Sequence, residues 1–145
     1  MRDTNDTISV RVARRFSASA EQVFDAWLDP KRAVEWLFAT PAGKRVRCEI
    51  DPRVGGRFAI VELRDGVEAY HGGVYLELDR PRLLAFSFAL DEALSNASRV
   101  QIDIRPLARG CELVLTHELS AVYAEYEART KQGWVTILEG LARAV

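Results

Sequence analysis

Three ionisable side chains stand inside apolar, strand-like segments, where a charge or an imidazole is costly unless it is paired: Glu62, His71 and Glu77. Over residues 67–78, alternation places His71, Tyr75 and Glu77 on one face of the predicted strand. If that face lines an interior, these side chains would hold the polar end of a ligand. If it faces solvent, they are ordinary surface residues, and this is the interpretation we favour for Glu77, whereas both interpretations stay open for His71.

His117 lies in the string LTHEL, at the end of a predicted strand. An imidazole there could act as a general base, because it titrates near neutrality. No nucleophile or acid partner is identifiable by spacing, which favours a structural hydrogen bond instead. His71, His117, Cys48 and Cys111 show no pair with the spacing of a zinc motif, so we predict neither a metal site nor a cofactor.

Arg57 belongs to a group of arginines around one loop whose interleaved acidic residues indicate a solvated face. Its guanidinium would still suit an anionic ligand group, because guanidinium pairs well with carboxylates. Gly55 and Gly56, just before it, lack a following helix N-terminus and are interpreted as turn residues rather than a phosphate loop.

A set of aromatic and aliphatic side chains lies on elements that should converge. Its members are Trp36, Phe38, Phe58, Ile60, Tyr70, Tyr75, Phe86, Phe88, Tyr126 and Trp134. Aromatic rings line ligand pockets and also fill close-packed interiors, so each residue has both interpretations. Together with Arg57, Glu62 and His71, this set is the predicted ligand-binding site.

The elements that would position these residues begin with a strand over residues 9–16, where β-branched residues alternate. Ser19 and Gln22 then resemble a capping box, which predicts a short helix as far as Asp29. Asp29 as cap and Pro30 as first helical residue predict a second short helix directly after it.

Six further strands, separated by turn residues, are predicted after the two helices. They cover residues 44–51, 57–64, 67–78, 83–89, 99–107 and 111–119. Asp65-Gly66 is a strong two-residue hairpin signal between two of them. Connections this short favour antiparallel neighbours.

The last segment is helical, because one apolar face recurs at the spacing of an α-helix. That face contains Trp134, Ile137, Leu138, Leu141 and Val145. The helix would begin near Ser120 or one turn later. The whole pattern predicts an α+β fold in which a seven-stranded antiparallel sheet wraps around a long C-terminal helix. We expect one domain over residues 1–145, with a flexible N-terminus over residues 1–7.

Composition limits the classes of partner. The chain has 145 residues, 28% charged residues and a formal net charge of -1, which argues against nucleic acid and anionic membranes. The N-terminus lacks the apolar core of a signal peptide, and no apolar run reaches the ~18 residues of a membrane helix. Two cysteines are too few for a disulfide framework, so we expect reduced thiols and a cytoplasmic location.

Several strings, taken in order, resemble the helix-grip superfamily of polyketide cyclases and START-like lipid-transfer domains (SRPBCC). Within it the sequence is most similar to the family of the activator of heat-shock protein 90 ATPase. The strings are residues 20–27 (AEQVFDAW), Asp29-Pro30, Trp36, residues 51–58 (DPRVGGRF), Gly73-Val74-Tyr75, Pro81 with Leu83, Thr116-His117 and Gly133-Trp134. They extend over nearly the entire chain.

The resemblance implies a deep cavity between sheet and C-terminal helix that holds a hydrophobic or amphipathic small molecule. In the eukaryotic activator this domain is the C-terminal part of a longer chain, and its N-terminal domain has no counterpart here. A chaperone is therefore a weaker expectation as partner than a small molecule.

Three functional hypotheses follow. The first is a non-covalent binding module for a small hydrophobic or aromatic metabolite, with or without an acidic group. The second is an enzyme of cyclase, dehydratase or hydrolase type, in which His71 or His117 moves protons in the same cavity. The third is a protein-interaction module, such as a co-chaperone or a regulator's partner, whose marker would be a large exposed apolar patch. Homodimerisation is compatible with the sequence, but no pattern specifies an interface.

Overall fold

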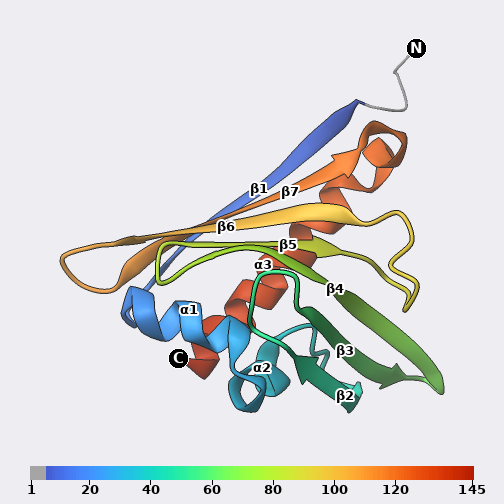
Figure 1. Cartoon of the computed structure of the whole chain (residues 1–145), viewed down its shortest axis with the longest axis horizontal. Coiled ribbons are helices and arrows are strands. Elements are labelled where there is room, and N and C mark those ends of the chain that lie inside the picture. Colours follow the sequence, from blue (N-terminus) through green and yellow to red (C-terminus); the bar gives the residue numbers. More distant parts are fainter. Residues whose placement is uncertain (1–5) are drawn as a thin grey trace.

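A seven-stranded antiparallel sheet and one long helix dominate residues 6–145, the part of the chain that the computed structural model describes (Figure 1). The elements are β1 (Thr7–Phe16), α1 (Ala20–Leu28), α2 (Pro30–Trp36), β2 (Lys44–Ile50), β3 (Arg57–Arg64), β4 (Val67–Asp79), β5 (Leu83–Phe88), β6 (Ser98–Pro106), β7 (Cys111–Ser120), the 3₁₀ segment η1 (Ala121–Tyr126) and α3 (Glu127–Ala144). The sheet order is β1-β7-β6-β5-β4-β3-β2, which confirms the predicted fold class.

The two short helices start where the capping residues predict. The Ser19 side chain accepts from the backbone N–H of Gln22, and the Gln22 side chain accepts from the Ser19 backbone N–H, which completes the capping box of α1. Asp29 caps α2 by accepting from the backbone N–H of Lys31, with Pro30 in the first turn. Both predicted starts are confirmed.

The hairpin between β3 and β4 turns at Asp65 and Gly66, whose φ angles are 51° and 79°. Positive φ at both central residues is the geometry of a type I′ turn, which matches the twist of the flanking strands. Short turns and the longer loop 89–97 link the remaining consecutive strands, so β2 to β7 form a meander and β1 closes the sheet beside β7.

A β-bulge in β4 decides which of its side chains face inward. Tyr75 pairs with Phe86, whereas Glu77 pairs with Ala85, so the alternation shifts by one residue between them. His71 lies before the bulge on the inner face and is 8% exposed, so the solvated interpretation of His71 is wrong. Glu77 lies after the bulge, exposed and paired with Arg99, so the same interpretation is confirmed for Glu77.

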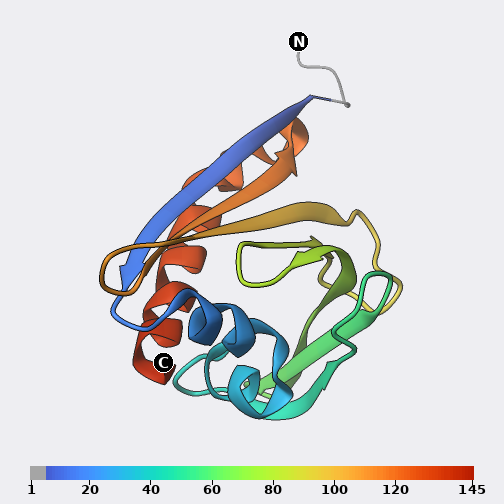
Figure 2. The ribbon, with the colours of Figure 1, turned by 60° about the vertical axis from the view of Figure 1, so that its left-hand side comes forward.

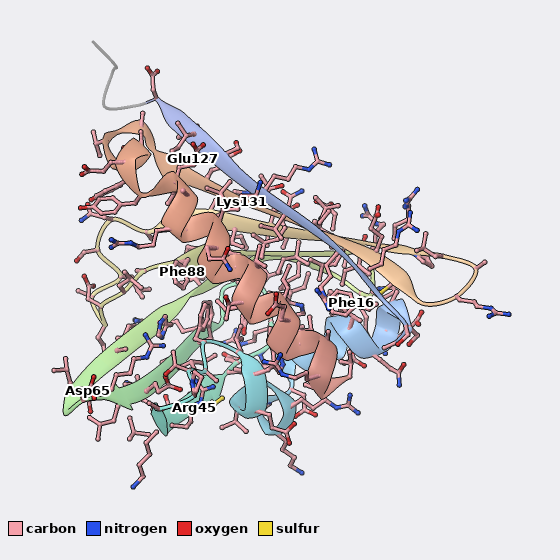
Figure 3. All side chains as sticks on the ribbon, turned by 180° about the vertical axis from the view of Figure 1, so that it is seen from behind. Phe16, Arg45, Asp65, Phe88, Glu127 and Lys131 are labelled. Carbon is pink, nitrogen blue, oxygen red and sulfur yellow. The ribbon has the colours of Figure 1, made fainter. Side chains whose placement is uncertain are left out.

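Helix α3 crosses one face of the sheet, and Figure 3 views the molecule from that side. Its C-terminal half carries Leu138 and Leu141, both 0% exposed, into the main core. The sheet curls, as Figure 2 shows, with α1 and α2 packed at one end beside the C-terminal part of α3. The helices therefore close that end, and the N-terminal half of α3 covers the other end alone.

The predicted start of the last helix, near Ser120 or one turn later, corresponds to η1 followed by α3. Residues 1–5 of the predicted flexible N-terminus lie outside the described residues, and Thr7 already pairs with Ser120. Across residues 6–145, no helix combines the length and apolar character needed to cross a membrane.

Candidate functional site

A cavity of about 640 Å³ lies under the N-terminal half of α3. Its wall comes from β4, β5, β7, α3 and the loop before β2, and its mouth is formed by the loop 89–97 and η1. The lining residues are Phe38, His71, Phe88, Ala89, Leu90, Asp91, Ser95, Asn96, Ser98, His117, Leu119, Tyr123, Tyr126, Arg129, Thr130, Gly133, Trp134 and Ile137. Most of this surface is apolar, as is usual for sites of small molecules.

Five rings from separate elements meet at the inner end of the cavity, and we call them the cavity cluster. They are Phe38, His71, Phe88, His117 and Trp134. Phe38 stacks on His71 with ring centroids 4.5 Å apart and an interplanar angle of 2°. Phe88 lies close to α3 in Figure 3, and its ring centroid is 5.9 Å from that of Trp134. The predicted residues Phe38, His71, Phe88 and Trp134 therefore converge, joined at the mouth by Tyr126.

Another group of predicted residues is placed in the closed core instead. These residues are Trp36, Phe58, Ile60, Tyr75 and Phe86, each at most 4% exposed and none of them lining the cavity. Trp27 packs against Trp36 and Phe86, with centroid distances of 4.7 and 6.3 Å. Trp27 lies on α1 and Trp36 on α2. The two helices therefore fill with side chains the space in which the sequence allowed either a closed core or a pocket.

The remaining predicted residues lie away from the cavity. Arg57 is exposed, and its Nη2 donates to the backbone oxygen of Glu92 at 2.9 Å. Tyr70 lies on the opposite face of β4 from His71, with its ring over Gly72, where a Cβ atom would come within 2.6 Å of it. Neither residue lines the cavity.

Glu62 supports the cavity from behind. Its carboxylate accepts from the backbone N–H of Thr40 at 3.1 Å, from Thr40 Oγ1 at 2.5 Å and from Arg64 Nε at 2.8 Å. Arg64 also donates to the backbone oxygen of Phe38 at 3.1 Å. Burial alone would raise the pKa of Glu62, but the bonds from Thr40 and Arg64 outweigh it, and the pKa is lowered.

This clamp holds Phe38 in an unusual backbone conformation. Phe38 has a φ of 56°, a region that bulky residues rarely adopt and that costs about 1–3 kcal/mol. Arg45 adds a bond of 2.7 Å from Nη2 to the backbone oxygen of Leu37. The strained residue is the one that stacks on His71, so the clamp positions a wall of the cavity.

His117 is held in one neutral tautomer by its neighbours. Trp134 Nε1 lies 3.0 Å from His117 Nδ1, and an indole nitrogen only donates, so Nδ1 must accept. The hydrogen is then on Nε2, which donates to Ser98 Oγ at 2.6 Å. Burial lowers the pKa of His117 to about 4, in agreement with a neutral ring at pH 7.

This tautomer is the wrong one for serine activation. A base that activates serine accepts the hydroxyl proton at Nε2 and donates from Nδ1 to an orienting group. Here Nε2 already carries hydrogen, and the lone pair of Nδ1 is used by Trp134. Ser98 and His117 therefore serve as polar wall groups, as the structural interpretation of His117 predicted.

His71 is also neutral, with one nitrogen engaged. Its Nδ1 lies 3.2 Å from the backbone oxygen of Ile60, which only accepts, so Nδ1 carries the hydrogen. Burial lowers the pKa of His71 to about 4, and the nearby Arg64 and Arg45 cations add to this effect. Nε2 is then an acceptor on the cavity wall.

The prediction from the sequence omitted most of the residues at the mouth of the cavity. Ser98, Tyr123, Arg129 and Gly133 line the cavity but were not predicted as site residues. Gly133 lies on α3 beside Trp134 and one turn before Ile137, which also line the cavity, and this helical spacing could have identified Gly133. Ser98 follows a polar loop and gave no such signal. Among residues 6–145, no three His, Cys, Asp or Glu side chains converge as metal ligands would.

Residues 17–145 match the family model described as Activator of Hsp90 ATPase homolog 1-like protein. None of the curated proteins compared with the chain matches it. Among solved structures, protein CV1439 from Chromobacterium violaceum is 28% identical, with a TM-score of 0.81 over 94% of this chain and 96% of that one.

Two further solved structures share the fold at lower identity. The AHSA1-like protein from Aeromonas hydrophila is 20% identical, with a TM-score of 0.82 over 95% of this chain and 92% of that one. CalU16 from Micromonospora echinospora is 24% identical, with a TM-score of 0.69 over 93% of this chain and 74% of that one.

Proposed function

The chain belongs to the Activator of Hsp90 ATPase homolog 1-like family, and from that premise we propose that it binds one small, largely apolar molecule non-covalently under α3. The observation that carries the proposal is the cavity of about 640 Å³ lined mainly by apolar side chains. Pockets for small molecules commonly measure ~300–1,000 Å³ and combine apolar walls with a few polar groups. A cytoplasmic location remains a prediction of the sequence.

Binding without chemistry agrees with the state of the two histidines. Both nitrogens of His117 are engaged, and Ser98 accepts from it rather than losing a proton to it. His71 keeps a free lone pair, but a pKa of about 4 makes it a weak base at neutral pH. The cyclase, dehydratase or hydrolase alternative therefore has less support than the binding module.

Tryptophan fluorescence tests the proposal, because the tryptophans occupy different places. Trp134 lines the cavity, whereas Trp36 lies in the closed core, and each is 3% exposed. Small aromatic acids, fatty acids and phenols would be titrated into the protein. We expect a saturable fluorescence change with at least one class, which Trp134→Phe abolishes and Trp36→Phe retains.

Thermal unfolding supplies an independent readout. A compound at about a hundred times its dissociation constant adds ~2.7 kcal/mol to the unfolding free energy, which raises Tm by several degrees. Each variant is compared with its own ligand-free Tm. The absence of any saturable shift across the panel would refute the proposal, as would a fluorescence change that depends on Trp36 alone.

A further inference from the structure

The cavity wall contains one strong hydrogen-bond acceptor that its own chain does not use. His71 is 8% exposed, and its Nδ1 donates to Ile60. Within residues 6–145, no donor lies at hydrogen-bond distance from His71 Nε2. Nε2 is not one of the fully buried unpartnered side-chain atoms, so it is open to the cavity that His71 lines, where a bound molecule with a donor can form a hydrogen bond to it.

Water that reaches Nε2 finds few other polar groups of the protein beside it. A buried water needs two to four polar partners. The imidazole is flanked by aromatic rings, with Phe38 at 4.5 Å and Phe88 at 6.2 Å between centroids. Glu62, the carboxylate that acts on the imidazole, is already engaged by Thr40 and Arg64. A ligand that fills the apolar space and carries a hydrogen-bond donor is a better partner for Nε2 than water is.

The charges behind His71 restrict the kind of donor. Arg64 and Arg45 act on the imidazole as nearby cations, partly offset by Glu62. A positive potential disfavours an ammonium group and favours a neutral hydroxyl whose oxygen gains negative charge as it donates. The aromatic walls formed by Phe38, Phe88 and Trp134 favour a flat ring as the carrier of that hydroxyl.

We propose that the cavity selects a hydroxylated aromatic molecule whose phenolic O–H donates to His71 Nε2, and that it discriminates against the O-methyl ether of the same molecule. This inference rests on the proposed function and adds the chemical class of the ligand. A site that must pair a buried polar group rejects an analogue that lacks the partner. The ether oxygen has no hydrogen and faces a lone pair, so it leaves Nε2 unpaired.

Calorimetric titration of two matched pairs tests this selectivity: 2-naphthol with 2-methoxynaphthalene, and 4-phenylphenol with 4-methoxybiphenyl. We expect each phenol to bind about tenfold more tightly than its ether, which corresponds to one net hydrogen bond. His71→Asn keeps an amide N–H for the Ile60 carbonyl, but its shorter side chain leaves no acceptor at the position of Nε2. In that variant we expect the preference to fall to near one, through weaker binding of the phenol alone.

Two control variants separate the preference for the phenol over the ether from effects of the shape of the cavity. Phe38→Leu removes the stacked ring and should weaken the phenol and the ether equally, leaving their ratio unchanged. Glu77→Gln lies on the same strand after the bulge and faces solvent, so it should change neither affinity.

A measurement on the unchanged protein keeps the test independent of variant folding. The ¹⁵N resonance of His71 Nε2 reports its lone pair directly. We expect 2-naphthol to shift it in the direction of hydrogen-bond acceptance and 2-methoxynaphthalene to leave it near its free value. His117 Nε2, which already donates to Ser98, gives the resonance of a ring nitrogen that carries hydrogen, for comparison.

The outcomes distinguish the inference from the function on which it rests. Equal affinity for phenol and ether, an unmoved His71 resonance, or a preference that survives in His71→Asn would overturn the inference while the binding function stands. If no compound of either pair binds, the proposed function fails for aromatic ligands, and the inference fails with it.

Discussion

At the scale of residues, the two histidines show how neighbours set the chemistry of a side chain. His117 lies between an indole donor and a serine hydroxyl, and His71 lies between a carbonyl and a stacked phenyl ring. Both rings are therefore neutral, each in a defined tautomer. One uses both nitrogens within the protein, and the other presents an acceptor to the cavity.

Acidification should destabilise the protein because of these two residues. Each folded-state pKa is about 4, below the value of about 6.5 for a free imidazole. Between these values the unfolded chain binds protons that the folded chain does not. The unfolding free energy should thus be highest above pH 6.5 and fall as pH drops toward 4, by at most about 1.4 kcal/mol per pH unit for each histidine.

Urea unfolding in steps from about pH 7 to about pH 5 measures this dependence. The ion-paired carboxylates Glu62 and Glu112, whose pKa values are lowered, titrate below this window. In His117→Phe we expect roughly half of the slope to remain. An unfolding free energy that stays constant over the window would contradict the neutral assignment.

At the scale of elements, the C-terminal half of α3 packs in the core and its N-terminal half lines the cavity. Leu138 and Leu141 pack in the core, whereas Gly133 lines the cavity. A Cβ atom added at Gly133 would meet no atom within 4 Å, but at Gly140 it would touch Trp36 at 3.6 Å, an ordinary contact. The two glycines are therefore a matched pair on one helix.

Alanine at either position should raise the unfolding free energy by about 0.5–1 kcal/mol, because glycine is a poor residue for a helix interior. The two substitutions should differ in binding. We expect Gly133→Leu, which extends into open cavity space, to weaken affinity for 2-naphthol at least about tenfold. Gly140→Ala should leave that affinity unchanged.

Chemical denaturation and calorimetry of these variants check both expectations. Equal affinity of Gly133→Leu and the unchanged protein for 2-naphthol would show that the compound binds elsewhere.

At the scale of the whole molecule, apolar side chains are packed unevenly between a closed end and an open end. The closed end combines α1, α2 and the C-terminal half of α3 over the sheet. The open end has exposed apolar side chains at its mouth: Leu90 is 67% exposed, Tyr123 40% and Tyr126 43%. Tyr123 also interrupts the 3₁₀ geometry of η1 with a φ of -101° and a ψ of 19°.

Hydrogen exchange should therefore be fast at the mouth and slow across the central strands, since weakly packed segments open most easily. Saturating 2-naphthol should slow exchange in the loop 89–97 and in η1. The amides of β6 and β7 should change little. Mass spectrometry of peptides from these segments checks this, and protection spread evenly over the whole sheet would argue against a ligand under α3.

The fold was accessible from the sequence because local rules decided its elements. Alternation predicted the strands, the Ser19 and Asp29 caps predicted the two helices, and Asp65-Gly66 predicted the two-residue hairpin. Short connections then left an antiparallel meander closed by one apolar helix face. The resemblance of strings along the chain agrees with the family to which it belongs.

The site was accessible only in part, because its residues depend on contacts between distant elements. Alternation in β4 could not reveal the bulge that separates His71 from Glu77. Hydrophobicity could not distinguish Phe86, packed under Trp27, from Phe88, which lines the cavity two residues later. In the first case, the pairing of β4 with β5 decides which polar side chain faces inward. In the second, the periodic pattern shows which side chains are apolar, whereas the packing of α1, α2 and α3 decides which of them remain uncovered.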